Sequence, residues 1–153
     1  MIFKLPMTVL AGLTLASVAH AGNLWPPRSY DQGVVAEWNA MLASATPQTA
    51  GNEIPRYYAL MHIAMSDAIS SIEHKSPVLH TRVPAARHAS TDAAAAQAAH
   101  DVLVALLPAR RADFDLELKE RLATINPERG RLGAEVGRLV AQRTLEWASR
   151  QHA

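Results

Sequence analysis

The apolar residues of this chain recur at intervals of three and four positions, which is the spacing of an amphipathic α-helix. From Tyr30 onward, the first such stripe comprises Val34, Val35, Trp38, Met41, Leu42 and Ala45. The segment from Pro47 to Gly51 predicts a break, and Pro55 suits the first turn of a second helix. The stripe of this second helix comprises Leu60, Met61, Ala64, Ala68, Ile69 and Ile72. Two amphipathic helices are therefore expected before residue 73.

A loop and two further helices are predicted next. Residues 73–89 contain two prolines and lack helical periodicity, so we expect a loop, long enough to pack over a partner surface. Ser90 or Thr91 is a suitable N-cap for a third, alanine-rich helix that ends at Pro108. A fourth helix is expected from Ala109. Its apolar stripe comprises Phe114, Leu118, Leu122 and Ile125.

The last helix has a clear start and an unusual face. Asn126 and Pro127 are typical of the N-cap and first turn of a helix. Gly133, Gly137 and Ala141 then form a small-residue face, which predicts close contact with another helix. No stretch of the sequence alternates with the period of two that is typical of strands. We therefore predict an all-α fold with about five helices in an antiparallel bundle.

The first 21 residues are typical of a signal peptide. Lys4 is followed by an apolar stretch and by the small-residue cleavage pattern Ala19-His20-Ala21. As a helix, the apolar stretch would span about 21 Å, less than the ~30 Å hydrocarbon core, so it does not predict a membrane anchor. We expect an exported protein, periplasmic or secreted, that is off the membrane after cleavage. The predicted divisions are a signal peptide at 1–21, an extended leader at 22–33 and a helical domain at 34–151.

Composition excludes several classes of protein. The chain of 153 residues has 15 Lys and Arg against 14 Asp and Glu, and loss of Lys4 with the signal peptide balances the charges. A nucleic-acid-binding protein would need a basic excess, so no nucleic acid partner is expected. The absence of cysteine excludes disulfides, thiolate zinc sites and iron–sulfur clusters.

Several segments taken together resemble a known family. Trp38-Asn39 is followed by Arg56-Tyr-Tyr-Ala-Leu-Met-His62-Ile-Ala-Met-Ser-Asp67-Ala68. The alanine-rich segment ending Leu-Leu-Pro108 and the Gly133-x3-Gly137 helix come after it. Over residues 34–150 this succession resembles the N-terminal helical half of bacterial vanadium-dependent haloperoxidase-like proteins, in the type 2 phosphatidic acid phosphatase superfamily. The resemblance implies that the chain is half of a larger haloperoxidase-like helical fold.

The chemistry of that family belongs to its C-terminal half. There, a Lys with an Arg-Pro, a Ser-Gly-His and an Arg-x5-His bind phosphate or vanadate, and the last His bonds the phosphorus or vanadium. This sequence has neither Ser-Gly-His nor Arg-Pro. The near-matches Lys75/Arg82 and Arg56/His62 have the wrong neighbours and the inverse order. The resemblance therefore implies no catalytic residue and no cofactor in this chain, because vanadate or phosphate would bind the missing half.

Polar residues on two predicted helices form a candidate metal site: His62, Asp67, His100 and Asp101. Imidazole and carboxylate groups are common metal ligands. However, the sequence has no His-x3-His or His-Glu-x2-His pair that would place two imidazoles on one helix face. The favoured interpretation is a half-buried histidine that is hydrogen-bonded to a neighbouring helix. We therefore assign no metal ligand from the sequence.

The sequence also contains two charged segments. An acidic run is interspersed with basic residues, which predicts a solvated face. Its acidic members are Asp113, Asp115, Glu117 and Glu120. A second set of residues could form an anion-binding stripe on the last helix, although Glu128 and Glu135 offset it. This stripe comprises Arg129, Arg131, Arg138 and Arg143.

Two functions of different classes are consistent with these patterns. The first is the N-terminal scaffold portion of an exported vanadium haloperoxidase-like phosphatase, inactive alone, as a truncated gene product or a remnant scaffold. It predicts an uncovered apolar face for the catalytic half or for self-association. The candidates for this face are Trp147, Val136, Leu139, Leu60 and Met61. The second is a free-standing exported helical module that binds a protein or a small ligand. A metal carrier that uses the scattered histidines is a weaker third hypothesis.

Overall fold

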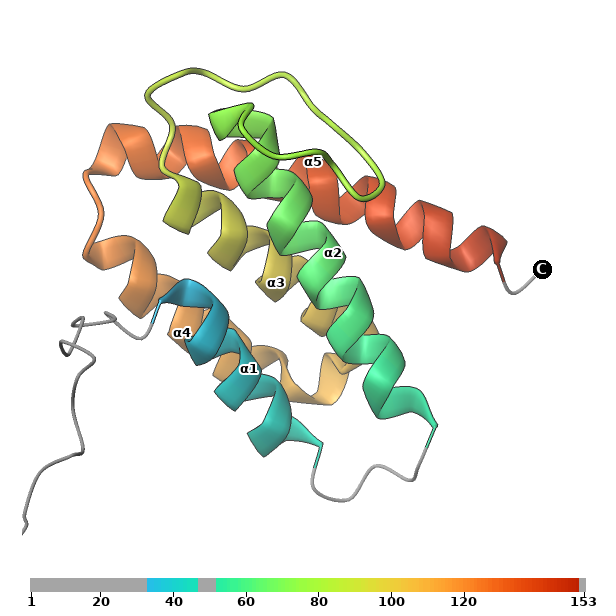
Figure 1. Ribbon diagram of the computed structural model, residues 1–153. Helices are drawn as coiled ribbons and strands as arrows, with labels where there is room; N and C mark the ends of the chain where they lie inside the picture. Colours follow the sequence, from blue (N-terminus) through green and yellow to red (C-terminus); the bar gives the residue numbers. More distant parts are fainter. Residues whose placement is uncertain (1–32, 47–51, 152–153) are drawn as a thin grey trace, which may run out of the picture. The chain divides into compact units, whose positions relative to one another are not determined.

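The computed structural model describes residues 33–46 and 52–151 of the chain. These residues contain five α-helices, one 3-10 turn and no strand. They are α1 (Val34–Ala45), α2 (Glu53–Glu73), α3 (Thr91–Leu106), η1 (Pro108–Arg110), α4 (Arg111–Ala123) and α5 (Pro127–Arg150). The predicted all-α fold is therefore confirmed. Successive helices run in opposite directions (Figure 1). The predicted signal peptide, the leader through residue 32 and the break at 47–51 lie outside the described residues.

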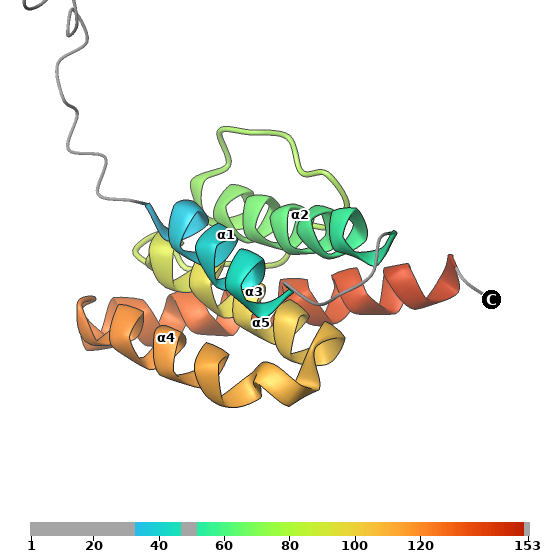
Figure 2. The ribbon, with the colours of Figure 1, turned by 90° about the horizontal axis from the view of Figure 1, so that it is seen from below.

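Helix α3 is the centre of the fold. It lies between a layer formed by α1 and α2 and a layer formed by α4 and α5 (Figure 2), and it contacts all four of these helices. Six alanines in its N-terminal part are fully buried: Ala93, Ala94, Ala95, Ala96, Ala98 and Ala99. Because a methyl group projects little from the helix, neighbouring helices can approach α3 closely on every side.

The ends of the helices follow local signals. The Ser90 hydroxyl accepts the N–H of Ala93 at 3.2 Å, and the Asn126 side chain accepts that of Arg129 at 3.2 Å, so both predicted N-caps are confirmed. The fourth helix starts later than predicted, because Pro108–Arg110 form the 3-10 turn η1. Ile125 lies beyond the end of α4, where its N–H still bonds the Leu122 carbonyl. No helix in the described ranges is both long enough and apolar enough to cross a membrane.

Helices α3 and α5 are in backbone contact. Gly133 and Gly137 are buried, and a Cβ atom at Gly137 would overlap the Ala94 carbonyl oxygen and lie 2.8 Å from the Gln97 Cβ. At Gly133 a Cβ would overlap the Ser90 carbonyl oxygen and lie 2.9 Å from the Ala93 Cβ. The predicted close helix contact is therefore confirmed, and only glycine fits at these two positions.

The predicted uncovered apolar face is mostly wrong. Leu60, Met61 and Val136 are only 4%, 0% and 3% exposed, because α2 and α5 pack against α3 and against each other. Of the five candidates, Leu139 is 40% exposed and Trp147 is half-buried. A stripe on a single helix cannot distinguish a face that covers its own core from one that awaits a partner.

Candidate functional site

Asp67 is a buried carboxylate that fixes the loop between α2 and α3. It accepts the backbone N–H groups of Leu79, His80 and Thr81 at 2.5, 2.8 and 2.7 Å. Ser71, one turn further along α2, accepts the N–H of Val83 at 3.1 Å. Three donors satisfy a buried charge well. These bonds hold the loop on the chain's own α2, and the expectation that the loop packs over a partner surface stays a prediction.

His62 lies apart from Asp67 in its interactions. Its ring is half-buried and stacks on that of Tyr58, with the ring centroids 6.3 Å apart. Arg56, its partner in the near-match to the family motif, lies 3.7 Å from the Glu53 carboxylate in an ion pair. Both groups therefore have local partners on α2.

His100 joins α3 to α4. Its Nδ1 lies 2.8 Å from Asp101 and its Nε2 lies 2.7 Å from Asp115 on α4. Gln97 donates to the same Asp101 oxygen at 2.8 Å, and the Trp38 indole packs edge-on, at 6.3 Å between centroids. Burial of the imidazole lowers the pKa of His100, but the two carboxylates outweigh it, and the net pKa is raised above 6.5. Both ring nitrogens can donate only in the imidazolium form.

The four residues of the candidate metal site therefore separate. His100 and Asp101 lie together with Asp115, whereas Asp67 binds the loop and His62 stacks on Tyr58. No group of three His, Cys, Asp or Glu side chains in the described part of the chain is placed to hold a metal ion. The favoured interpretation of His62, a half-buried histidine bonded to a neighbouring helix, does not describe its contact, which is with Tyr58 on the same helix. The histidine that bonds a neighbouring helix is the buried His100.

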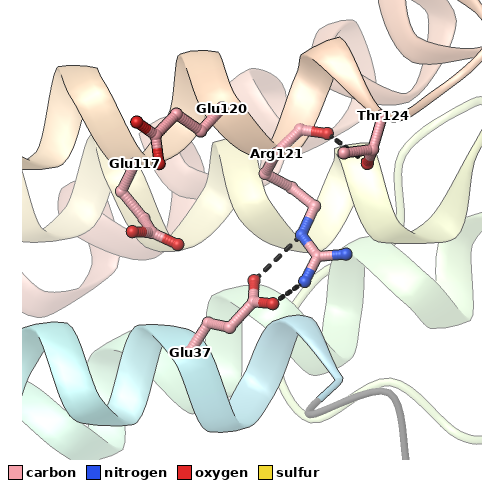
Figure 3. A pocket seen from close by; sticks show the side chains of 5 residues that line it. All are labelled: Glu37, Glu117, Glu120, Arg121 and Thr124. Carbon is pink, nitrogen blue, oxygen red and sulfur yellow. Dashed lines mark hydrogen bonds and ion pairs between the residues drawn. The ribbon is translucent and has the colours of Figure 1, made fainter.

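An ion pair links α1 to α4 beside an acidic cleft. The Arg121 guanidinium donates through two nitrogens to the Glu37 carboxylate (Figure 3), with an Nε–Oε2 distance of 2.9 Å. Glu117, Glu120 and Thr124 complete the lining of this cleft, whose volume is about 290 Å³. In Figure 3, Glu117 and Glu120 have no dashed contact to Arg121. The ion pair between Glu37 and Arg121 holds α1 against α4. The cluster of carboxylates in the cleft does not by itself identify a ligand.

A second cleft, here called the basic cleft, lies where the end of α2 meets the starts of α3 and α5. Its volume is about 490 Å³. Its lining residues are Ile72, Glu73, His74, Lys75, Arg87, Ala89, Thr91 and Arg129. Three are cations and one is an acid. Lys75, Arg87 and Arg129 form no ion pair with any residue that the structure describes. The lining therefore carries an excess of positive charge.

Sequence reasoning missed the basic cleft. Arg129 was grouped with a stripe on α5, but Arg131 pairs with Glu135 at 3.9 Å, and Arg143 donates to the Arg82 carbonyl at 3.1 Å. In the sequence, Lys75 belongs only to a near-match to the family motif. Lys75 and Arg87, two of the three Lys and Arg residues of the loop, were visible signals. Their convergence with Arg129 was not, because it depends on how α5 packs against α3.

The third feature is an apolar groove between α2 and the end of α5, with a volume of about 180 Å³. It is lined by Arg56, Ala59, Leu60, Ile63, Trp147, Ala148 and Gln151. The Trp147 ring also stacks on His80 of the loop, at 4.9 Å between centroids. The groove thus retains part of the predicted apolar face, namely Leu60 and Trp147.

Comparisons with protein-family models, with curated protein sequences and with solved structures give no match to this chain.

Proposed function

We propose that this chain is the helical scaffold portion of an exported haloperoxidase-like phosphatase, and that it does not carry out that chemistry alone. The observation that carries the proposal is the use made of Asp67. This carboxylate belongs to the His-x4-Asp-Ala segment that carries the resemblance, and it accepts hydrogen bonds from three backbone N–H groups of the loop. The alanine-rich segment likewise forms the buried centre of the fold. Both segments that carry the resemblance therefore have structural roles in this fold.

The groups nearest to a catalytic pattern have other partners. Oxyanion chemistry requires several donors aimed at one developing charge. Arg82 instead donates to the carbonyls of Ser70 and Ser76 and to the ring of His74, at 3.1, 3.2 and 2.6 Å. His62 stacks on Tyr58. These contacts support a structural role for both near-matches.

The partner of such a scaffold is a catalytic helical half. We place its contact in the apolar groove, because Leu60, Ile63 and Trp147 gather there from two helices. The large exposed apolar side chains elsewhere lie singly on different elements: Val35, Leu79, Leu116 and Leu139. A helix from the catalytic half fits a groove of this kind. Self-association through the same groove is the competing outcome.

Coexpression tests this proposal. The DNA after the coding sequence is read in all frames for Ser-Gly-His and Arg-x5-His segments, and any such polypeptide is coexpressed with the chain. We expect copurification, with phosphatase or haloperoxidase turnover only when both are present. Ile63→Glu should abolish copurification, whereas Leu116→Glu, an exposed apolar position on α4, should preserve it. Turnover by the chain alone that disappears in His62→Ala would contradict the proposal.

The alternative is a free-standing exported module that binds a protein or a small ligand. It is favoured by the buried core around α3 and by the presence of the basic cleft. A chain that is a clean monomer by light scattering, binds no hydrophobic dye and has no copurifying catalytic half would support this alternative.

A further inference from the structure

We infer that the basic cleft binds a small organic acid that carries two carboxylates. Its three cations come from three places: Lys75 just after α2, Arg87 near the end of the loop, and Arg129 in the first turn of α5. Like charges around one concave surface repel each other. Glu73 is the only acid in the lining, so a dianion would complete the balance of charge. The inference does not require the scaffold role.

The wall that carries Arg129 is held in place. The Arg129 Nε donates to the His88 carbonyl at 3.0 Å, and the Arg129 carbonyl accepts the N–H of Ser90 at 3.0 Å. These bonds join the start of α5 to the loop and to the start of α3. The two terminal nitrogens of Arg129 keep an edge suited to a carboxylate. Binding would therefore cost little ordering of the backbone.

His74 adds a donor from a strained position. It has a φ of 56°, the one positive φ among the described non-glycine residues, and caps α2 with its N–H on the Ser70 carbonyl. Its Nδ1 lies 2.6 Å from the Arg82 guanidinium, which can only donate. The neutral ring therefore carries its proton on Nε2, as a donor. Strained residues are concentrated at binding sites.

The positive charge of the basic cleft is carried by side chains. Phosphate sites are commonly built from free backbone amides at a helix start. Here the Ser90 hydroxyl and carbonyl take up the N–H groups of Ala93 and Ala94, and the Ser90 N–H bonds Arg129. The planar guanidinium groups of Arg87 and Arg129 are two-nitrogen donors, and two such donors around one cleft can each bind one carboxylate of a dicarboxylate. Ile72 and Ala89 offer apolar lining for a short carbon chain.

Calorimetric titration of the full chain tests this assignment. The probes are succinate, butyrate, which has the same carbon count but one carboxylate, and inorganic phosphate. We expect saturable succinate binding about 10-fold tighter than that of butyrate, and weaker at high salt. Absence of saturable succinate binding would overturn the inference. So would equal affinity for butyrate, or tighter binding of phosphate.

Charge-matched variants locate the site. Lys75→Gln and Arg87→Gln should each weaken succinate binding about 10-fold, because each removes a charged partner that has no other ion pair among the described residues. Lys119→Gln and Arg138→Gln remove the same charge from exposed positions outside the lining, and should change affinity less than about twofold. Equal losses in all four variants would show a nonspecific charge effect and overturn the inference. Far-ultraviolet circular dichroism confirms that each variant is folded.

Discussion

Helix α3 meets α5 through small residues, and it meets α1 and α4 through large and polar ones. Toward α5, glycines allow contact with the α3 backbone itself. Toward α1 and α4, the fully buried rings of Trp38 and Phe114 pack at 6.4 Å between centroids, beside His100 and its two carboxylates. The first interface depends mainly on the close fit of the two helix backbones. The second depends on volume, charge and protonation together.

This difference predicts opposite sensitivities. An interface built from backbone contact has no space for an added atom, so enlargement is its weakness. An interface built from large rings loses most when a ring is removed, because a cavity remains. Its ionic part should respond to pH and salt, which the glycine interface should not.

Removal of the Phe114 ring should have the largest effect. Phe114→Ala is expected to lower the free energy of unfolding by about 4 kcal/mol, because the ring is fully buried against Trp38. Urea unfolding measured by circular dichroism checks this value. Leu116→Ala, an exposed position on the same helix, should cost far less. Similar losses in the two variants would mean that α4 does not pack as described.

Addition of one methyl group should damage the other interface. Gly137→Ala is expected to cost about 2–3 kcal/mol, because the new Cβ would overlap the Ala94 carbonyl. Gly130→Ala is the matched control on the same helix, since its Cβ would meet only Ile125 at an ordinary 3.5 Å. This control should be neutral or stabilising by up to about 1 kcal/mol. If both alanines were equally tolerated, the close contact of α3 and α5 would be refuted.

The ionic part of the second interface should depend on pH. Because the pKa of His100 is raised in the folded protein, the stability that it contributes is full below about 6.5. This contribution is lost as the pH rises through the raised pKa, when the ring gives up one of its two N–H donors. Nuclear magnetic resonance titration of the imidazole and urea midpoints across this range measure the effect. His100→Gln should remove that pH dependence, at a cost of about 1–2 kcal/mol. An identical pH profile in the variant would exclude His100 as its source.

The smallest effect is expected at the pair between α1 and α4. Arg121→Gln removes a two-nitrogen ion pair whose side chains are 10% and 27% exposed, and should cost about 1 kcal/mol. The loss should shrink as salt is added. Arg131→Gln breaks the pair with Glu135, whose side chains are 69% and 60% exposed, and should be nearly silent. A larger loss for Arg131 than for Arg121 would contradict the assigned packing of α1.

The helices, most of their boundaries and the small-residue face of α5 could be predicted from the sequence. These depend on apolar period, on caps such as Ser90 and Asn126, and on the size of Gly133 and Gly137. All of these act over a few residues along one helix, so the order of residues is enough to predict them.

Which polar and apolar groups are in contact depends on the tertiary structure. Glu37 and Arg121 are 84 positions apart, and His100 finds its second carboxylate on another helix. Leu60 and Val136 were predicted to be exposed and are buried, whereas Lys75, Arg87 and Arg129 converge on one cleft. An amphipathic stripe indicates that a helix will bury one face. Which other helix covers that face depends on the packing of all five helices at once. Long-range pairing therefore cannot be obtained from local period or spacing.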